Sequence, residues 1–274
     1  MGAPTGARTL DDDAVRGLAD ELAAATSSGG TVPLISERHP EMTVEDAYAV
    51  QRIWAQRRLE AGGRIAGRKI GLTSKAMQDA TGITEPDYGV IFEDQVVRSG
   101  DELPWDRWSN VRIEVELAFE LGRDLSGPDC SREDVLEATT AVIPALEILD
   151  SHIQLTGRTI VDTISDNAAL GAMVLSDTRV APDAFDLRWA GAMLSRNGTV
   201  EESGVSGAVL GDPALGVAWL ANRLAPHGET LKAGEVILSG SFTRPLWVER
   251  GDDIRCAYRA ANGLDLGEIA CRFV

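Results

Sequence analysis

Two stretches in the first 62 residues carry apolar side chains at helical spacing. An acidic start at residues 11–13 is followed by apolar residues three or four positions apart, namely Val15, Leu18, Ala19 and Leu22. Gly29 and Gly30 end this pattern. A second pattern begins after Thr43, a residue type that caps helices, and continues to Gly62. We therefore expect a helical N-terminal segment over residues 1–62.

From residue 63 onward the pattern changes to short alternating runs separated by turn residues, which is typical of β-strands. Asn197–Gly198 and Asn262–Gly263 lie between such runs and predict hairpin turns. The expected strands are 64–72, 111–121, 142–150, 169–176, 185–196, 199–204, 235–240, 246–249, 253–259 and 266–273.

Two further helices are expected among these strands. One starts at Ser131, and the other has Asp212 as its N-cap, Pro213 at its first position and an end before Pro226. Because the strands do not alternate regularly with long helices, a doubly wound parallel sheet is not expected. The pattern predicts an α+β fold in which residues 63–274 form a mixed, mostly antiparallel β-roll or barrel with flanking helices.

The net charge of the chain argues against some classes of binding partner. The 274 residues include 26 basic and 43 acidic side chains, which gives a net charge of −17. Such a field repels phosphate backbones, so nucleic-acid binding is not expected. An anionic substrate would also be repelled unless a metal ion, Lys or Arg supplied local positive charge. Without a secretory leader, an apolar run of about 18 residues or a CxxC pair, we expect a cytoplasmic protein that makes no membrane contact.

Three glutamates form the first candidate site. Glu114 and Glu116 share one face of an expected strand, with their backbones roughly 6–7 Å apart. Their carboxylates could converge on one hard cation, although a solvated polar face is the alternative. Glu147 lies in another expected strand between apolar same-face neighbours, where a lone carboxylate is expensive to bury unless it is paired or bound to metal. An exposed strand end is the alternative for Glu147.

Lys69 and Asp87 are candidates for acid–base chemistry. Gly67 and Gly71 flank Lys69 on its own strand face and leave room for another group to approach. Lys69 there could bind an anion or relay a proton, or it could be a surface residue at a strand edge. Asp87 lies in the turn-like run Glu-Pro-Asp-Tyr-Gly, where it could orient water or simply cap a turn.

Polar residues after two apolar runs are candidates for substrate contacts. Ser241, Thr243 and Arg244 follow an expected strand and could form a carboxylate cradle, or an ordinary polar loop. Asp162, Ser165, Asp166 and Asn167 form a second polar group with the same ambiguity. The chain has no Gly-x-Ser-x-Gly elbow, Walker loop, dinucleotide fingerprint or zinc motif. Serine hydrolases, P-loop NTPases and zinc enzymes are therefore not expected.

Several sequence blocks in order resemble the 2-keto-4-pentenoate hydratase branch of the fumarylacetoacetate hydrolase superfamily. The resemblance runs from about residue 40 to the C-terminus. The matching blocks are GRKIGLTSKAMQ, EPDYGVIF, RIEVELAFEL, PALEILD, DTISDNAA, GDPALGVAWLANRLA, ILSGSFTRP and GEIACRFV.

The resemblance implies a set of roles for these residues. It implies an Mg²⁺ site, with Mn²⁺ as an alternative, at Glu114, Glu116 and Glu147, and a catalytic Lys69 with Asp87 across the pocket. It also implies a catalytic β-roll over 63–274 and a ring-like homo-oligomer resembling a pentamer or decamer. Association with a pathway decarboxylase or aldolase is a further expectation. The expected substrate contacts are Leu72, Thr73, Ser165, Ser241, Thr243 and Arg244.

The expected reaction is addition of water to a 2-hydroxy-2,4-dienoate in aromatic meta-cleavage catabolism, giving a 4-hydroxy-2-oxo acid. A seven-carbon 1,7-dioate is the expected substrate, and Arg244, with Arg68 second, is the expected partner of its distal carboxylate. The alternatives are hydration of a five-carbon monoacid, decarboxylation of a 2-oxo-enedioate, and a metal-dependent scaffold without turnover. The resemblance also implies that hydrolysis of a C–C bond is not expected. Hydrolytic members of the superfamily use a His–Glu pair near the pocket to activate water, and no His lies between Pro40 and Ser151 here.

Overall fold

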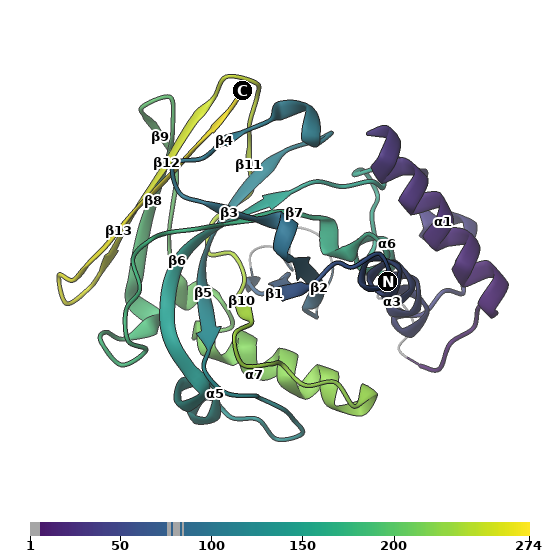
Figure 1. Ribbon diagram of the computed structural model, residues 1–274, viewed down its shortest axis with the longest axis horizontal. Helices are drawn as coiled ribbons and strands as arrows, with labels where there is room; N and C mark the ends of the chain where they lie inside the picture. The colour runs from purple at the N-terminus through teal and green to yellow at the C-terminus, as the bar shows by residue number, and fades with distance from the viewer. Residues whose placement is uncertain (1–5, 76–77, 79–82, 84) are drawn as a thin grey trace.

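The two N-terminal helices form where the sequence pattern predicts them. The computed structural model describes residues 6–75, 78, 83 and 85–274. Helix α1 spans Asp12–Ser28 and is capped by the Asp11 side chain, and α3 spans Val44–Glu60 with a capping box at Thr43. Gly29 ends α1 in the left-handed conformation, at a φ of 67°. Both helices lie at one side of the molecule, beside the sheets (Figure 1).

The larger sheet has 8 strands and carries the candidate site. Its order is β2-β1-β10-β5-β6-β7-β3, with β11 paired to β5. The β1–β10 and β3–β7 pairs are parallel, and the other pairs are antiparallel. In chain order the strands are β1 (Ile65–Gly71), β2 (Asp87–Phe92), β3 (Val96–Arg98), β5 (Arg112–Leu121), β6 (Thr139–Leu149), β7 (Leu170–Leu175), β10 (Val236–Leu238) and β11 (Leu246–Trp247).

The smaller sheet has 5 strands in the order β4-β13-β12-β8-β9. Its strands are β4 (Glu102–Leu103), β8 (Ala190–Arg196), β9 (Thr199–Val205), β12 (Asp253–Ala260) and β13 (Asp265–Phe273). The predicted Asn197–Gly198 turn joins β8 to β9, with positive φ angles of 53° and 82°. In the described part of the chain neither sheet closes on itself, so the predicted α+β fold takes the form of an open roll rather than a barrel.

Shorter helices connect and cover the sheets. Helices α5 (Arg132–Ala138) and α7 (Pro213–Leu224) begin at the predicted caps Ser131 and Asp212. Helices α2 (Ile35–Arg38) and α6 (Ile160–Ser165) were not predicted. Figure 1 shows α7 crossing one end of the larger sheet near β10. Within the described residues, no helix has the length and apolar character needed to cross a membrane.

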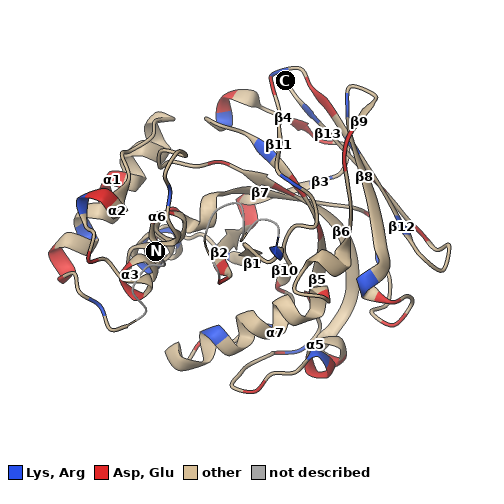
Figure 2. Cartoon of the chain, turned by 180° about the vertical axis from the view of Figure 1, so that it is seen from behind, with Lys and Arg blue, Asp and Glu red and all other residues tan. Residues whose placement is uncertain are grey.

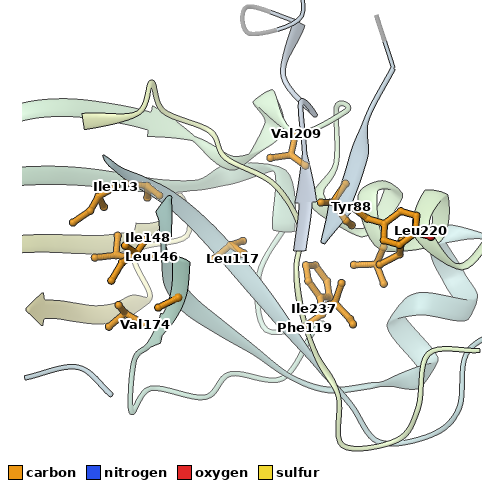
Figure 3. Close-up of a cluster of buried hydrophobic side chains, with 14 of the residues drawn as sticks. Tyr88, Ile113, Leu117, Phe119, Leu146, Ile148, Val174, Val209, Leu220 and Ile237 are labelled. Atoms are coloured by element: carbon orange, nitrogen blue, oxygen red, sulfur yellow. The ribbon is translucent and has the colours of Figure 1, made fainter. Parts of the chain in front are cut away.

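One main hydrophobic core joins the N-terminal helices to both sheets. It includes Val15 of α1, Tyr48 of α3 and Phe273 of β13. Figure 3 shows part of it, where Leu117 and Phe119 of β5 lie among side chains from neighbouring elements. Burial of this core supplies the main driving force for folding. The helices and the sheets share this core. The division of the chain into a helical segment, 1–62, and a β-roll domain, 63–274, stays a prediction.

Candidate active site

The three glutamates meet because of the register between β5 and β6. Glu114 pairs directly with Glu147, and Glu116 lies two residues further along the same face of β5. One carboxylate oxygen from each glutamate lies within 4.8 Å of its counterparts in the other two. Glu116 and Glu147 are 0% exposed, and Glu114 is at least half-buried. The polar face predicted for this strand is therefore turned into the protein.

Burial and mutual repulsion make this cluster unfavourable without a cation. Burial, with the nearby charge of Glu147, raises the pKa of Glu114 to about 7 and that of Glu116 well above its usual range. Oε2 of Glu116 accepts a hydrogen bond of 2.7 Å from the Gly240 amide. Oε1 of Glu116 and Oε2 of Glu147 have no hydrogen-bond partner among the described residues. These oxygens are available to a metal ion.

Lys69 faces the same cluster from β1. Its Nζ lies 3.0 Å from Oε1 of Glu147, and its side chain is 3% exposed. Burial alone would lower the pKa of Lys69, but the charges of Glu147, Asp87 and Glu114 outweigh it and raise that pKa. Lys69 is therefore a buried residue held among carboxylates, and not the surface residue that was its alternative.

Asp87 is the first residue of β2, and not part of a turn as its local composition suggested. It pairs with Gly71 across the β1–β2 ladder, so its carboxylate reaches the side of β1 that carries Lys69. A Cβ at Gly71 would collide with Oδ1 of Asp87 and lie 3.3 Å from Nζ of Lys69. Burial raises the pKa of Asp87, against the opposing charges of Lys69 and Arg158. Glycine at position 71 thus permits this close arrangement.

The segment after β10 contacts the cluster at Glu116. Gly240 has a φ of 114° and contacts Thr73 so closely that a Cβ at Gly240 would collide with the Thr73 side chain. The Oγ1 atoms of Thr73 and Thr243 are buried without a hydrogen-bond partner among the described residues. Ser241 instead donates to the Thr243 carbonyl over 3.1 Å. Thr73 and Thr243 are thus the hydroxyls with free bonding capacity here.

The remaining candidates have other surroundings. Leu72 follows β1 with a φ of 57°, an uncommon conformation for a residue with a side chain. Ser165 is buried and donates to the Val161 carbonyl over 2.7 Å. Arg244 is 79% exposed and pairs with Glu202, and among described residues no contact joins it to the glutamates. Arg68 points to the face of β1 opposite Lys69 and pairs with Glu229.

The polar group at residues 162–167 is used to build the fold around the site. Asp162 accepts hydrogen bonds from the Ser36 amide and hydroxyl, which ties α2 to α6. Asn167 binds both the N–H and the carbonyl of Val90 through its side chain, so it holds β2 next to the Asp87 position. These contacts span more than 70 residues of sequence, so local patterns could not reveal them.

Sequence reasoning missed two arginines, Arg112 on β5 and Arg158 in the loop before α6. Arg112 shares the β5 face with Glu114, is 7% exposed and lies beneath the Trp247 ring, with Cζ 5.2 Å from the ring centre. Burial and the charge of Arg158 lower the pKa of Arg112 to about 10. The alternation along β5 predicts the face of Arg112, but nothing local predicts the approach of Arg158.

The fold and this site define a class of enzyme: an open roll of mixed sheets with a buried carboxylate cluster and a buried lysine. The fumarylacetoacetate (FAA) hydrolase C-terminal family matches residues 64–274. The chain belongs to this family, as the sequence resemblance predicted.

Three relatives cover nearly the whole chain. The 2-oxo-hept-4-ene-1,7-dioate hydratase of Escherichia coli is 46% identical, over 94% of this chain and 97% of its own. The 2-keto-4-pentenoate hydratase of Paraburkholderia xenovorans is 40% identical, over 87% and 88%. The solved 4-oxalocrotonate decarboxylase from Pseudomonas putida G7, complexed with magnesium and adipate, has a TM-score of 0.92 at 32% identity and covers 98% of this chain and 100% of its own.

Proposed function

We propose that this protein is a divalent-metal-dependent hydratase acting on 2-hydroxyhepta-2,4-diene-1,7-dioate or its 2-oxo tautomer. The observation that carries the proposal is a cluster of three carboxylates inside the protein, with Lys69 in contact with one of them. The carboxylates are those of Glu114, Glu116 and Glu147. The relatives named hydratases, at 46% and 40% identity, favour hydration over the decarboxylation named for the solved structure at 32%.

The three glutamates fit a hard divalent cation. They present only carboxylate oxygens, the ligand type that Mg²⁺ and Mn²⁺ prefer, and two of these buried oxygens have no other partner among the described residues. When bound, such an ion would act as a Lewis acid on the substrate's C1 carboxylate and C2 oxygen. It would also offset the negative field of the chain at the point where an anion must bind.

Lys69 is assigned to stabilise the negative charge that develops on the C2 oxygen. The surrounding carboxylates keep it protonated, so it can donate a hydrogen bond to a developing enolate but is unsuited to act as a base. The anchor at Glu147 fixes the position of its Nζ. The enol proton is lost from the 2-hydroxyl and a proton is added at C5. The C2=C3 and C4=C5 double bonds thereby become C2=O and C3=C4, which gives the conjugated 2-oxo-3-enoate.

Asp87 is assigned as the base that activates the water molecule. Its burial raises the pKa of the carboxyl group, which favours accepting a proton from water as the water oxygen bonds to C4. The proton is then delivered to C3, so the net change is addition of one water across the double bond. Thr73 and Thr243 have free hydroxyls to contact the substrate carboxylate.

Product analysis tests this proposal against its alternatives. Metal-stripped protein would be supplied with Mg²⁺ and, separately, the seven-carbon dioate, the five-carbon monoacid and 2-oxo-3-hexenedioate, with products identified by NMR. A 4-hydroxy-2-oxo diacid formed only with metal is the expected result. Release of carbon dioxide would instead identify a decarboxylase, and no turnover by the protein alone would identify a scaffold.

We also propose a cytoplasmic location, assembly into a homo-oligomer larger than a dimer, and association with a pathway decarboxylase or aldolase. Basic positions are scattered among acidic ones over helices and sheets (Figure 2), and the net charge of −17 argues against nucleic-acid binding. Light scattering would contradict the oligomer if it found a monomer at every concentration.

A further inference from the structure

We propose that Arg112 and Arg158 bind the distal carboxylate of the substrate and select a dicarboxylate over a monoacid. This inference rests on the proposed function and names the residues that decide the substrate class. It replaces Arg244 in that role, because Arg244 is 79% exposed and already paired with Glu202.

Arg112 is a buried cation with unused hydrogen-bonding capacity. Its Nε is buried without a partner, and among the described residues no carboxylate lies within ion-pair distance of it. Its guanidinium makes a 3.5 Å contact with Oδ1 of Asn110, an oxygen that also accepts a 3.0 Å bond from the Ser151 amide. A guanidinium has five N–H donors. A desolvated cation in this state favours an incoming anion.

Arg158 approaches the same place from the loop before α6. Its Nη1 donates to the Ser151 hydroxyl over 3.0 Å, which leaves most of its donors free. The Ser151 amide in turn donates to Oδ1 of Asn110, the oxygen that Arg112 contacts, so the two arginines adjoin the same pair of polar residues. Two arginines held beside the same polar residues suit an anion, because the anion relieves the repulsion between their charges.

The spacing suits a seven-carbon diacid. Arg112 precedes Glu114 by two residues on the same strand face, a step of roughly 6–7 Å. A substrate held at C1 by the glutamate cluster would extend along β5 toward Arg112, with Trp247 beside it. The five-carbon monoacid lacks the group that would reach the arginines. They would therefore contribute to binding the dioate alone.

Kinetics on paired substrates test the assignment. For wild type, Arg112→Met, Arg158→Met and Arg244→Met, kcat/KM would be measured on the seven-carbon dioate and on the five-carbon monoacid. The ratio of the two values should fall about 10- to 100-fold in the first two variants, as expected for loss of a desolvated arginine–carboxylate pair. Arg112→Lys should recover part of the ratio, since it keeps the charge and loses the planar fork.

Two outcomes would overturn the assignment. Equal losses on both substrates would mean that the arginines are structural, and a loss of the ratio confined to Arg244→Met would return the role to Arg244. If Arg112→Met does not fold, Arg158→Met carries the same test.

A binding measurement separates this inference from the reaction itself. Calorimetry in Mg²⁺ would compare adipate with hexanoate, a diacid and a monoacid of equal length. Adipate should bind more tightly to wild type, and this preference should fall about tenfold in Arg158→Met. Equal affinity of wild type for both acids would contradict the role of the arginines. Wild-type preference for adipate without any hydratase activity would instead overturn only the proposed reaction.

Discussion

Lys69 and Glu147 form a buried ion pair across the larger sheet, with Nζ 3.0 Å from Oε1 and the two side chains 3% and 0% exposed. Removing one partner of such a pair leaves the other charge buried and uncompensated, which costs about 3–5 kcal/mol. Glu147 thus has two functions in our proposal, as a metal ligand and as the anchor of Lys69. Glu116 shares the first function only, so comparing the two residues separates metal binding from stability.

Glu116→Gln and Glu147→Gln should both weaken Mg²⁺ binding, by at least about tenfold, because each removes a charged oxygen ligand. In metal-free protein, Glu147→Gln should also lower the free energy of unfolding by a few kcal/mol, whereas Glu116→Gln relieves repulsion and should leave it unchanged or raised. Calorimetry would measure the Mg²⁺ affinity, and urea unfolding in EDTA would measure the free energy of unfolding of the metal-free protein. Unaltered Mg²⁺ affinity in both variants would rule out this metal site.

Lys69→Met should reduce kcat by at least about 10²-fold, the lower range for a positioned acid–base group. Methionine fills a similar volume, so the loss should come from the missing ammonium. Steady-state kinetics would separate the effect on kcat from that on KM, and calorimetry would measure the affinity for Mg²⁺. A variant with normal kcat and a raised KM would make Lys69 a substrate-binding residue alone.

Gly71→Ala and Gly17→Ala should change stability in opposite directions. A Cβ at Gly71 collides with Asp87 and crowds Nζ of Lys69, so we expect loss of activity and a lower melting temperature. Gly17 is exposed in the middle of α1, with nothing within 4 Å of its Cβ position. Alanine there should stabilise the protein by about 0.5–1 kcal/mol. Thermal unfolding would show both effects, and full activity in Gly71→Ala would contradict the close arrangement at Asp87.

The sequence predicts best what depends on local periodicity. Alternation along β5 places Glu114 and Glu116 on one face, and the N-caps of α1, α3, α5 and α7 mark where those helices begin. The proline and glycine near Asp87 favour a turn over residues 85–89, whereas pairing with β1 draws Asp87 into a strand. Tertiary contacts override local composition in that case.

Features made by distant contacts were not predictable from one sequence. Residues 167–169 have φ angles of 49°, 54° and 56°, three successive left-handed residues of which two are alanines. Such a turn costs about 1–2 kcal/mol per residue in isolation, so propensity argues against it. It persists here because the Asn167 side chain binds Val90 of β2. Arg158 likewise acquires its neighbours only when its loop folds over the end of β6.

His152 follows β6, in the loop that leads to Arg158, and lies between two carboxylates. Its Nδ1 is 3.0 Å from Oδ1 of Asp166, and its Nε2 is 3.5 Å from Oδ2 of Asp150. Burial lowers the pKa of His152, but hydrogen bonds to the two aspartates outweigh burial and raise it to about 10. The imidazolium therefore stabilises the folded state below its unfolded pKa of about 6.5, and this stabilisation is lost as the pH rises through about 10.

Urea unfolding of wild type and His152→Gln between about pH 6 and pH 10 should reveal this loss. The stability advantage of wild type should be largest at the low end and should shrink steadily with rising pH. Asp166→Asn removes one of the two carboxylates, so it should move the decline to lower pH. A constant difference between wild type and His152→Gln over the whole range would show that His152 is held as the neutral imidazole, and that its contacts stabilise the loop without charge.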